Sequence, residues 1–144
     1  MNTKMLSTRR ILICSLLAGA GIQAAQAADL TVRLSPITSS QGKVMLALYD
    51  SEASFRKTAA AMQQADAMEG EMTFTFNGLE PGEYAVTVMH DLNGNTELDA
   101  NLLGIPREPW GASLQGKRVF GPPSWNKTRF TLTDAGFSLD ITMR

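Results

Sequence analysis

The most constraining feature of this 144-residue sequence is an alternation of apolar and polar residues that recurs along the chain. Leu30, Val32 and Leu34 alternate with polar residues, and a period of two is typical of a strand with one buried face. The same period recurs at residues 72–77, 84–88, 130–132 and 137–143. Because no strand–helix–strand rhythm joins these segments, we expect a mainly β fold, an antiparallel β-sandwich of about six to seven strands.

Other segments refine the predicted sandwich. Residues 44–49 are apolar on both faces, which favours a central strand. Residues 130–132 and 137–143 are joined by a short connection, Asp134-Ala135-Gly136. We therefore expect these last two strands to pair with each other as a hairpin.

Two regions do not follow the strand period. In residues 51–68, Phe55, Ala59 and Met62 recur at helical spacing, which predicts one short helix. Residues 100–128 are rich in glycine and proline and fit neither period. We expect a long irregular loop there, and a loop of that length inside a compact domain is usually functional or disordered.

The start of the chain has the pattern of a secretory signal peptide. Lys4, Arg9 and Arg10 precede a mostly apolar run at 11–22, and Ala25-Gln26-Ala27 fits an A-x-A cleavage site. The apolar run is too short to cross a bilayer, which takes about 20 residues. We expect residues 1–27 to be a signal peptide cleaved after Ala27, and residues 28–144 to form a single β-sandwich domain in the periplasm or outside the cell.

Cleavage changes the chemistry of the chain. It removes the only cysteine, Cys14, so no disulfide can stabilise the mature domain. It also removes three basic residues and no acidic ones, which leaves a net charge of about −4. Such a domain gives no reason to expect a nucleic-acid partner, and no transmembrane segment is expected after cleavage. A partner outside the cytoplasm would be a protein or a glycan of unknown identity.

One segment has the pattern of a cation-binding loop. Asp91, Asn93 and Asn95 are spaced by two residues, and Glu97 and Asp99 follow. Ca²⁺ takes six to eight oxygen ligands, which alternating Asp and Asn side chains around a turn can supply. With Asp91 as position 1 of an EF-hand-type loop, Glu97 offers its backbone carbonyl at position 7. The spacing predicts a structural Ca²⁺ site.

The pattern departs from an EF-hand loop at two positions. Thr96 stands at position 6, where the sharp turn favours glycine, and Leu102 stands at position 12, which is normally a bidentate glutamate. The nearest carboxylate that could complete the site is Glu108. The alternative is an ordinary turn, because Asn, Gly and Asp are also turn residues that cap their own backbone.

A second candidate function rests on the aromatic residues of the irregular segment. Trp110, Phe120 and Trp125 could form a stacking surface for a peptide or a glycan, with no metal involved. The alternative is that they pack against one end of the sandwich. Both alternatives remain open at this point.

The sequence gives little support for catalysis. His90 is the only histidine, and its place on an apolar strand favours a packed or hydrogen-bonded imidazole. The segment around Ser113 lacks the second glycine of a nucleophile elbow. We therefore predict no catalytic residues and a protein that is not an enzyme.

Residues 79–113 resemble the core signature of domain of unknown function family 2141, a family of small exported bacterial proteins. The pattern is a Gly-x-Tyr-Ala strand, a His-Asp-x-Asn-x-Asn-x-x-x-Asp loop, then Gly-x-Pro-x-Glu and Gly-x-Ser. The matching residues are Gly82, Tyr84, Ala85, His90, Asp91, Asn93, Asn95, Asp99, Gly104, Pro106, Glu108, Gly111 and Ser113. The resemblance extends over nearly all of the mature chain and implies no established activity.

A weaker resemblance is carried by the turn Leu79-x-Pro81-Gly82-x-Tyr84. It is similar to turns of prealbumin-like and carboxypeptidase-regulatory-like sandwiches. This resemblance implies a prealbumin- or immunoglobulin-like sandwich.

Overall fold

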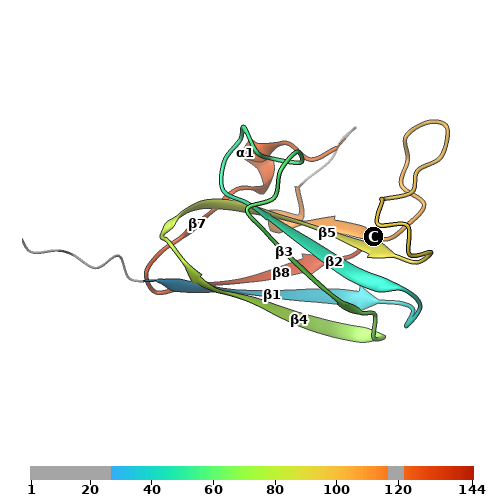
Figure 1. Ribbon diagram of the computed structural model, residues 1–144, viewed down its shortest axis with the longest axis horizontal. Coiled ribbons are helices and arrows are strands. Elements are labelled where there is room, and N and C mark those ends of the chain that lie inside the picture. Colours follow the sequence, from blue (N-terminus) through green and yellow to red (C-terminus); the bar gives the residue numbers. More distant parts are fainter. Residues whose placement is uncertain (1–26, 117–121) are drawn as a thin grey trace, which may run out of the picture.

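The computed structural model describes residues 27–116 and 122–144, and in these ranges the chain is built almost entirely of strands (Figure 1). Besides strands, the described residues contain one turn of α-helix and one short 3-10 segment in which Leu114 and Gln115 have positive φ. In chain order the elements are β1 (Ala28–Ile37), β2 (Lys43–Tyr49), β3 (Ala61–Asp66), β4 (Gly70–Leu79), β5 (Gly82–Asp91), β6 (Trp110–Ala112), the 3-10 turn η1 (Ser113–Gly116), α1 (Trp125–Thr128), β7 (Phe130–Leu132) and β8 (Phe137–Thr142).

The strands form two sheets that pack face to face, which confirms the predicted β-sandwich. One sheet has the order β4-β1-β8, and the other has the order β3-β2-β5-β6 with β7 also paired to β5. All pairs are antiparallel except β1 with β8, which is parallel. β2 lies between β3 and β5, as the doubly apolar residues 44–49 predict.

The core lies between the two sheets. Alternate residues of β1 point into it, and Leu30, Val32 and Leu34 are 0% exposed. From the facing sheet, β2 contributes Val44 and Leu46 to the same cluster. The period of two seen in the sequence therefore marks the inner faces of the sheets, because apolar side chains gain free energy when they leave water.

The helix predicted over residues 51–68 is wrong. Residues 51–57 form turns, and the strand β3 follows along the edge of β2. The turns are stabilised by the Ser54 hydroxyl, which donates to Asp50 Oδ1 at 3.0 Å. In β3, pairing with β2 supplies the backbone hydrogen bonds that a helix would otherwise have to make itself. The α-helix that the described residues contain is α1, close to the C-terminus.

The predicted terminal hairpin is also wrong. β7 pairs with β5 in one sheet, and β8 pairs with β1 in the other. Between them only Thr133 and Gly136 form an isolated bridge. The two strands still meet through their side chains, since the Phe130 and Phe137 rings stack with centroids 4.9 Å apart. A short connection therefore crosses between sheets here, and the core contact replaces the hydrogen bonds of a hairpin.

A second apolar cluster lies on the outer face of the larger sheet, the face turned away from β4-β1-β8. It joins Tyr49, Phe55, Ala85 and Trp125. The Phe55 ring meets the Tyr49 ring edge-on at 5.3 Å and the Trp125 ring at 5.8 Å. The 51–57 turns and α1 thus cover one half of this face, and the other half is left for the site described below.

The predicted signal peptide lies almost wholly outside the described residues, which begin at residue 27. Within 27–116 and 122–144, no helix has the length and apolar composition that crossing a bilayer requires.

Candidate functional site

The Asx loop, which we define as residues 91–99, begins at the end of β5 and is organised by the Asp91 carboxylate. Asp91 is only 1% exposed. Its Oδ1 accepts the Gly94 N–H at 2.7 Å and its Oδ2 accepts the Thr96 N–H at 2.9 Å. Burial of this carboxylate opposes its ionisation, but the N–H groups of the loop outweigh that effect and hold the pKa of Asp91 below its ordinary value.

Glu108 closes the same loop from the other side. Its side chain is buried, Oε1 accepts the Leu92 N–H at 2.9 Å, and Oε2 accepts the Asp99 N–H at 3.1 Å. One carboxylate therefore joins the first and last parts of the Asx loop. Both donors belong to irregular backbone that makes no sheet hydrogen bonds, so the carboxylate supplies the partners that such groups require.

On the exposed side of the loop, the Asp99 carboxylate connects the side chains of Asn93 and Asn95. The Asn93 Nδ2 donates to Asp99 Oδ2 at 2.6 Å, and the Asn95 Nδ2 donates to Asp99 Oδ1 at 3.0 Å. The amide oxygens serve the backbone, because Asn93 Oδ1 accepts the Asn95 N–H and Asn95 Oδ1 accepts the Glu97 N–H. These are Asx turns.

The structure thus brings the side chains of Asp91, Asn93, Asn95, Asp99 and Glu108 into one network, while Glu97 contributes its N–H. Every carboxylate oxygen of Asp91, Asp99 and Glu108 accepts an N–H. Across residues 27–116 and 122–144, no group of three or more His, Cys, Asp or Glu side chains is placed to hold a metal ion. The loop closes through its own hydrogen bonds, and the Ca²⁺ site stays a prediction.

Positive φ angles at Thr96 and Gly42 shape the start of this region. Thr96 has φ 64°, although it is β-branched and such residues rarely take positive φ. It occupies the position at which an EF-hand-type loop requires a sharp turn. Gly42 has φ 74°, and a Cβ there would lie 1.9 Å from the Asp91 carbonyl oxygen. Only glycine fits where the β1–β2 connection approaches the start of the loop.

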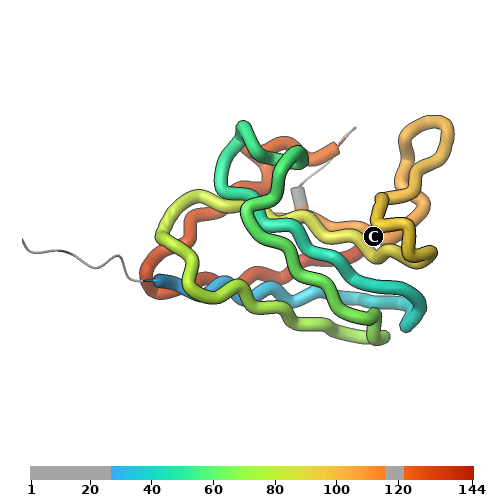
Figure 2. The backbone as a smooth tube through the Cα atoms, in the orientation of Figure 1, coloured from blue at the N-terminus to red at the C-terminus, as the bar shows by residue number. Residues whose placement is uncertain are grey.

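A small hairpin extends from the Asx loop and projects from the end of the sandwich (Figure 2). The Arg107 N–H donates to the Asp99 carbonyl at 2.7 Å, and the Asn101 N–H donates to the Ile105 carbonyl at 2.9 Å. At its tip, which we define as residues 101–105, Asn101 Oδ1 accepts the N–H groups of Leu103 and Ile105. The predicted irregular segment is therefore partly a defined hairpin.

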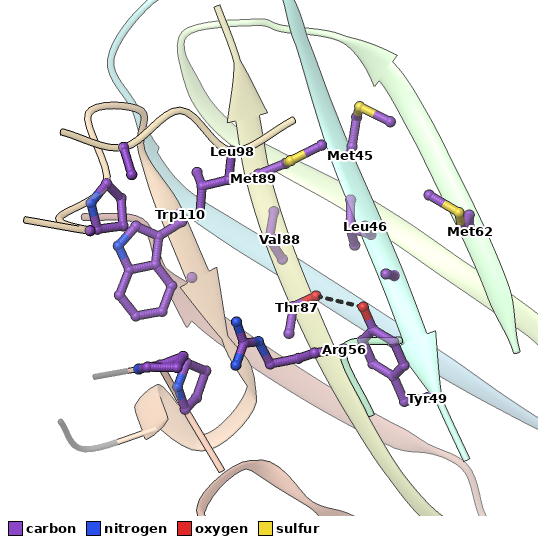
Figure 3. A pocket seen from close by; sticks show the side chains of 17 residues that line it. Met45, Leu46, Tyr49, Arg56, Met62, Thr87, Val88, Met89, Leu98 and Trp110 are labelled. Atoms are coloured by element: carbon purple, nitrogen blue, oxygen red, sulfur yellow. Dashed lines mark hydrogen bonds between the residues drawn. The ribbon is translucent and has the colours of Figure 1, made fainter. Parts of the chain in front are cut away.

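A groove of about 430 Å³ lies on the uncovered half of the outer sheet face, a size that suits a small ligand. Its floor comes from β2 and β5, whose residues Met45 and Met89 are direct cross-strand partners. The loop and hairpin contribute Leu98, Ala100 and Pro106 to its lining, and Arg56, Pro122 and Pro123 also line it. Figure 3 shows Leu98 and Arg56 at different places along β5.

The three aromatic residues predicted as a binding surface lie in different places. Trp110 stands at the start of β6 and lines the groove. Trp125 is 6% exposed and packs against Phe55, and it is not among the lining residues. Phe120 lies outside the described residues. Of the three, Trp110 is the one that the structure places in the groove.

His90 and Ser113 are both buried and hydrogen bonded. His90 is 1% exposed, and its Nε2 lies 2.7 Å from the Gln41 carbonyl oxygen. The Ser113 Oγ accepts the Val86 N–H at 3.0 Å and donates to the Thr128 carbonyl at 2.5 Å. Both side chains serve to join backbone segments, which agrees with the packed-imidazole interpretation of His90.

Sequence reasoning missed Met45, Met89 and Arg56 as lining residues. The available signal was the apolar outer face of residues 44–49, which indicates a covered or ligand-binding face as well as a central strand. Arg56 was obscured by the predicted helix, because helical spacing gives no reason to place that residue beside β2 and β5.

The fold and the groove define a class: a small β-sandwich domain with an irregular loop bordering an apolar surface groove. Within it, residues 32–139 match the model of one family, described as "Uncharacterized protein conserved in bacteria (DUF2141)", and the chain belongs to that family. This confirms the family resemblance seen in the sequence. No curated protein and no solved structure matches the chain significantly.

Proposed function

We propose that this chain is an exported, non-catalytic binding module whose groove receives the apolar part of a ligand. The observation that carries the proposal is the groove itself, a volume of about 430 Å³ over the outer sheet face, lined by thioether, proline and indole groups. Apolar pockets of about 300–1,000 Å³ with few polar groups are typical small-ligand sites. Methionine side chains adapt to irregular ligands because they are unbranched and polarizable.

The absence of a catalytic role is part of the same proposal. A general base must lie within hydrogen-bond reach of a substrate, but the imidazole of His90 is buried and directed at the Gln41 carbonyl. The buried Ser113 hydroxyl is bonded to backbone groups. Export rests on the sequence of residues 1–27, which has the three regions of a signal peptide.

The test is the binding of a neutral apolar dye, N-phenylnaphthylamine, followed by its fluorescence. The protein should give saturable binding, and Met89→Gln should weaken it about fivefold, because a polar side chain replaces apolar contact area. Met68→Gln is the matched control, since Met68 is 62% exposed and does not line the groove. Absence of saturable binding, or equal losses in both variants, would contradict the proposal.

A second candidate function is structural Ca²⁺ binding by the Asx loop, through Asp91, Asn93, Asn95, Glu97 and Asp99 with Glu108. The observation that favours it is the loop's shape: Thr96 holds positive φ at the sharp-turn position, and the Asn93 and Asn95 amides converge on the Asp99 carboxylate. Turning both amides over would present oxygen instead of N–H beside Asp99. The ion would have to displace the present hydrogen bonds, which supports weak binding.

Thermal unfolding with Ca²⁺ and with chelator tests this candidate. At free Ca²⁺ tenfold above Kd, linkage gives about 1.4 kcal/mol of stabilisation, and Tm should rise by several degrees. Asp99→Asn should remove most of the rise, while Asp66→Asn, at an exposed residue of β3, should leave it unchanged. Identical melting curves with Ca²⁺ and with chelator would exclude the site.

A further inference from the structure

We propose that the ligand of the groove is a single-chain amphiphile whose carboxylate pairs with Arg56 while its alkyl chain lies over β2 and β5. The proposal rests on the binding function proposed above and names the chemical class of its ligand. It follows from three features of Arg56: its isolation as a charge, the backbone that displays it, and the surface beside it.

Arg56 is the only charged residue among the described residues that line the groove. The two ion pairs of the described chain are Arg33 with Asp140 and Arg129 with Glu83, and neither involves Arg56. The guanidinium carries five N–H donors in a planar fork that matches a carboxylate. The other lining residues are uncharged, and most are apolar, so the groove offers one positive anchor.

The backbone displays Arg56 in a conformation that L-residues avoid. Its φ is 58°, and left-handed backbone costs roughly 1–2 kcal/mol for a residue with a Cβ. The turn is held in place on one side by the buried Phe55 and on the other by the Lys57 N–H, which donates to the Ser54 carbonyl at 2.9 Å. Strain of this kind persists where surrounding structure imposes it, often at ligand sites.

The side chain extends along the groove. In Figure 3 the Arg56 side chain runs from the Tyr49 side of the pocket toward Trp110, and Met45 and Met89 lie farther along β2 and β5. From Tyr49 to Met45 the strand advances about 13 Å at about 3.3 Å per residue. An alkyl chain of medium length fits that distance, with its carboxylate at Arg56 and its tail between the two methionines.

Pairing with Arg56 predicts that the groove prefers a ligand with a carboxylate to one with a neutral head group. Exposed ion pairs contribute little, but a charge-assisted bidentate hydrogen bond at the edge of an apolar groove is stronger. We expect decanoate to bind roughly tenfold more tightly than decanol. A cationic amphiphile of the same chain length, decyltrimethylammonium, should bind more weakly than either.

Displacement of N-phenylnaphthylamine from the purified protein tests the proposal. Arg56→Gln should lower the affinity for decanoate to that for decanol and leave decanol unchanged. Arg56→Lys should restore part of the preference because the charge returns without the planar fork. Lys57→Gln is the matched control: it removes a neighbouring exposed cation that does not line the groove, and decanoate should still be preferred.

The outcomes separate this inference from the proposed function. Equal affinities for decanoate and decanol, or equal losses in Arg56→Gln and Lys57→Gln, would overturn the role of Arg56 while the apolar groove stands. If an apolar tripeptide carboxylate displaced the dye through Arg56 and decanoate did not, the ligand class would be wrong. If no probe displaced the dye and the dye itself did not bind, the proposed function would fail.

Discussion

The segment between β5 and β6 has a base, which we define as the Asx loop together with Glu108, and a tip at residues 101–105. The base buries charged side chains, whereas the tip exposes apolar ones. At the base, the Asp91 and Glu108 side chains are 1% and 6% exposed, and each carboxylate accepts two backbone N–H groups. At the tip, Leu102 and Leu103 are 105% and 83% exposed. Buried charge and exposed aliphatic side chains reverse the usual arrangement. Hydrogen bonds to carboxylates, and not apolar packing, therefore hold this part of the groove lining in place.

The largest effect is expected for Asp91→Ala. The substitution leaves the Gly94 and Thr96 N–H groups without their acceptor and opens the Asx loop, so Tm should fall by roughly 5–10 °C. Asp91→Asn keeps one acceptor oxygen and should cost less. Thermal unfolding followed by circular dichroism measures both. A melting temperature for Asp91→Ala equal to that of the unaltered protein would show that the loop does not depend on this carboxylate.

The Asp91 carboxylate should also make the stability of the protein depend on pH in the acid range. The pKa of Asp91 in the folded protein lies below its unfolded value of about 3.9, so the unfolded chain binds more protons between the two values. The stability that Asp91 contributes is fully present above about pH 4 and is lost as pH falls through the folded pKa. Tm measured from pH 6 to pH 3 should decline more steeply for the unaltered protein than for Asp91→Asn. Parallel curves would contradict the prediction.

A smaller loss is expected for Glu108→Gln. The glutamine keeps one carbonyl oxygen, but its NH₂ faces a backbone N–H that the carboxylate accepted, either that of Leu92 or that of Asp99. Loss of one hydrogen bond to a charged acceptor should cost about 1.5–3 kcal/mol. Urea unfolding measures the total, and hydrogen exchange should show lower protection at Leu92 or Asp99. Unchanged protection at both amides would argue against the bridge.

The sequence predicts the base of this segment better than its tip. Asp91, Asn93 and Asn95 are visible because Asx residues spaced by two organise a turn whether or not a cation binds. The hydrogen-bonded loop and the ion-bound loop require the same residue types, so the sequence alone does not distinguish them. The role of Glu108 was expected as a ligand of the ion, and its contact with the N–H of Leu92 depends on folding that no local pattern encodes.

Local sequence patterns predict the inner strands of the sandwich but not all of its elements or strand pairings. The inner-facing residues of β1 and β2 follow the period of two, because burial between the sheets decides their identity. The helix is predicted wrongly because Phe55, Ala59 and Met62 have helical spacing by coincidence: Phe55 lies in the 51–57 turns, and Met62 lies in β3. The parallel pairing of β8 with β1 joins residues more than a hundred positions apart, which a local pattern does not register.

Thr96→Gly should raise stability slightly. Thr96 holds φ 64° at the base, whereas the tip turn uses Gly104 at φ 73°. Replacing the threonine relieves left-handed strain, and we expect a gain of about 0.5–1 kcal/mol after the greater chain entropy of glycine is counted. Gly104→Ala introduces the opposite change and should cost about 1 kcal/mol. Urea unfolding of both variants tests the pair, and a loss of stability in Thr96→Gly would show that its side chain contributes more than the strain costs.

The smallest change in stability is expected for substitutions of the two leucines at the tip. Because the Leu102 and Leu103 side chains are exposed, Leu102→Ser and Leu103→Ser should change the free energy of unfolding by no more than about 0.5 kcal/mol. The hairpin should persist, since its tip is closed by Asn101 Oδ1 and not by the leucines. Asn101→Ala is the informative contrast: it removes that acceptor and should speed hydrogen exchange at Leu103 and Ile105. If the serine variants instead lost as much stability as Glu108→Gln, the leucines would be packed in solution and the contrast between base and tip would collapse.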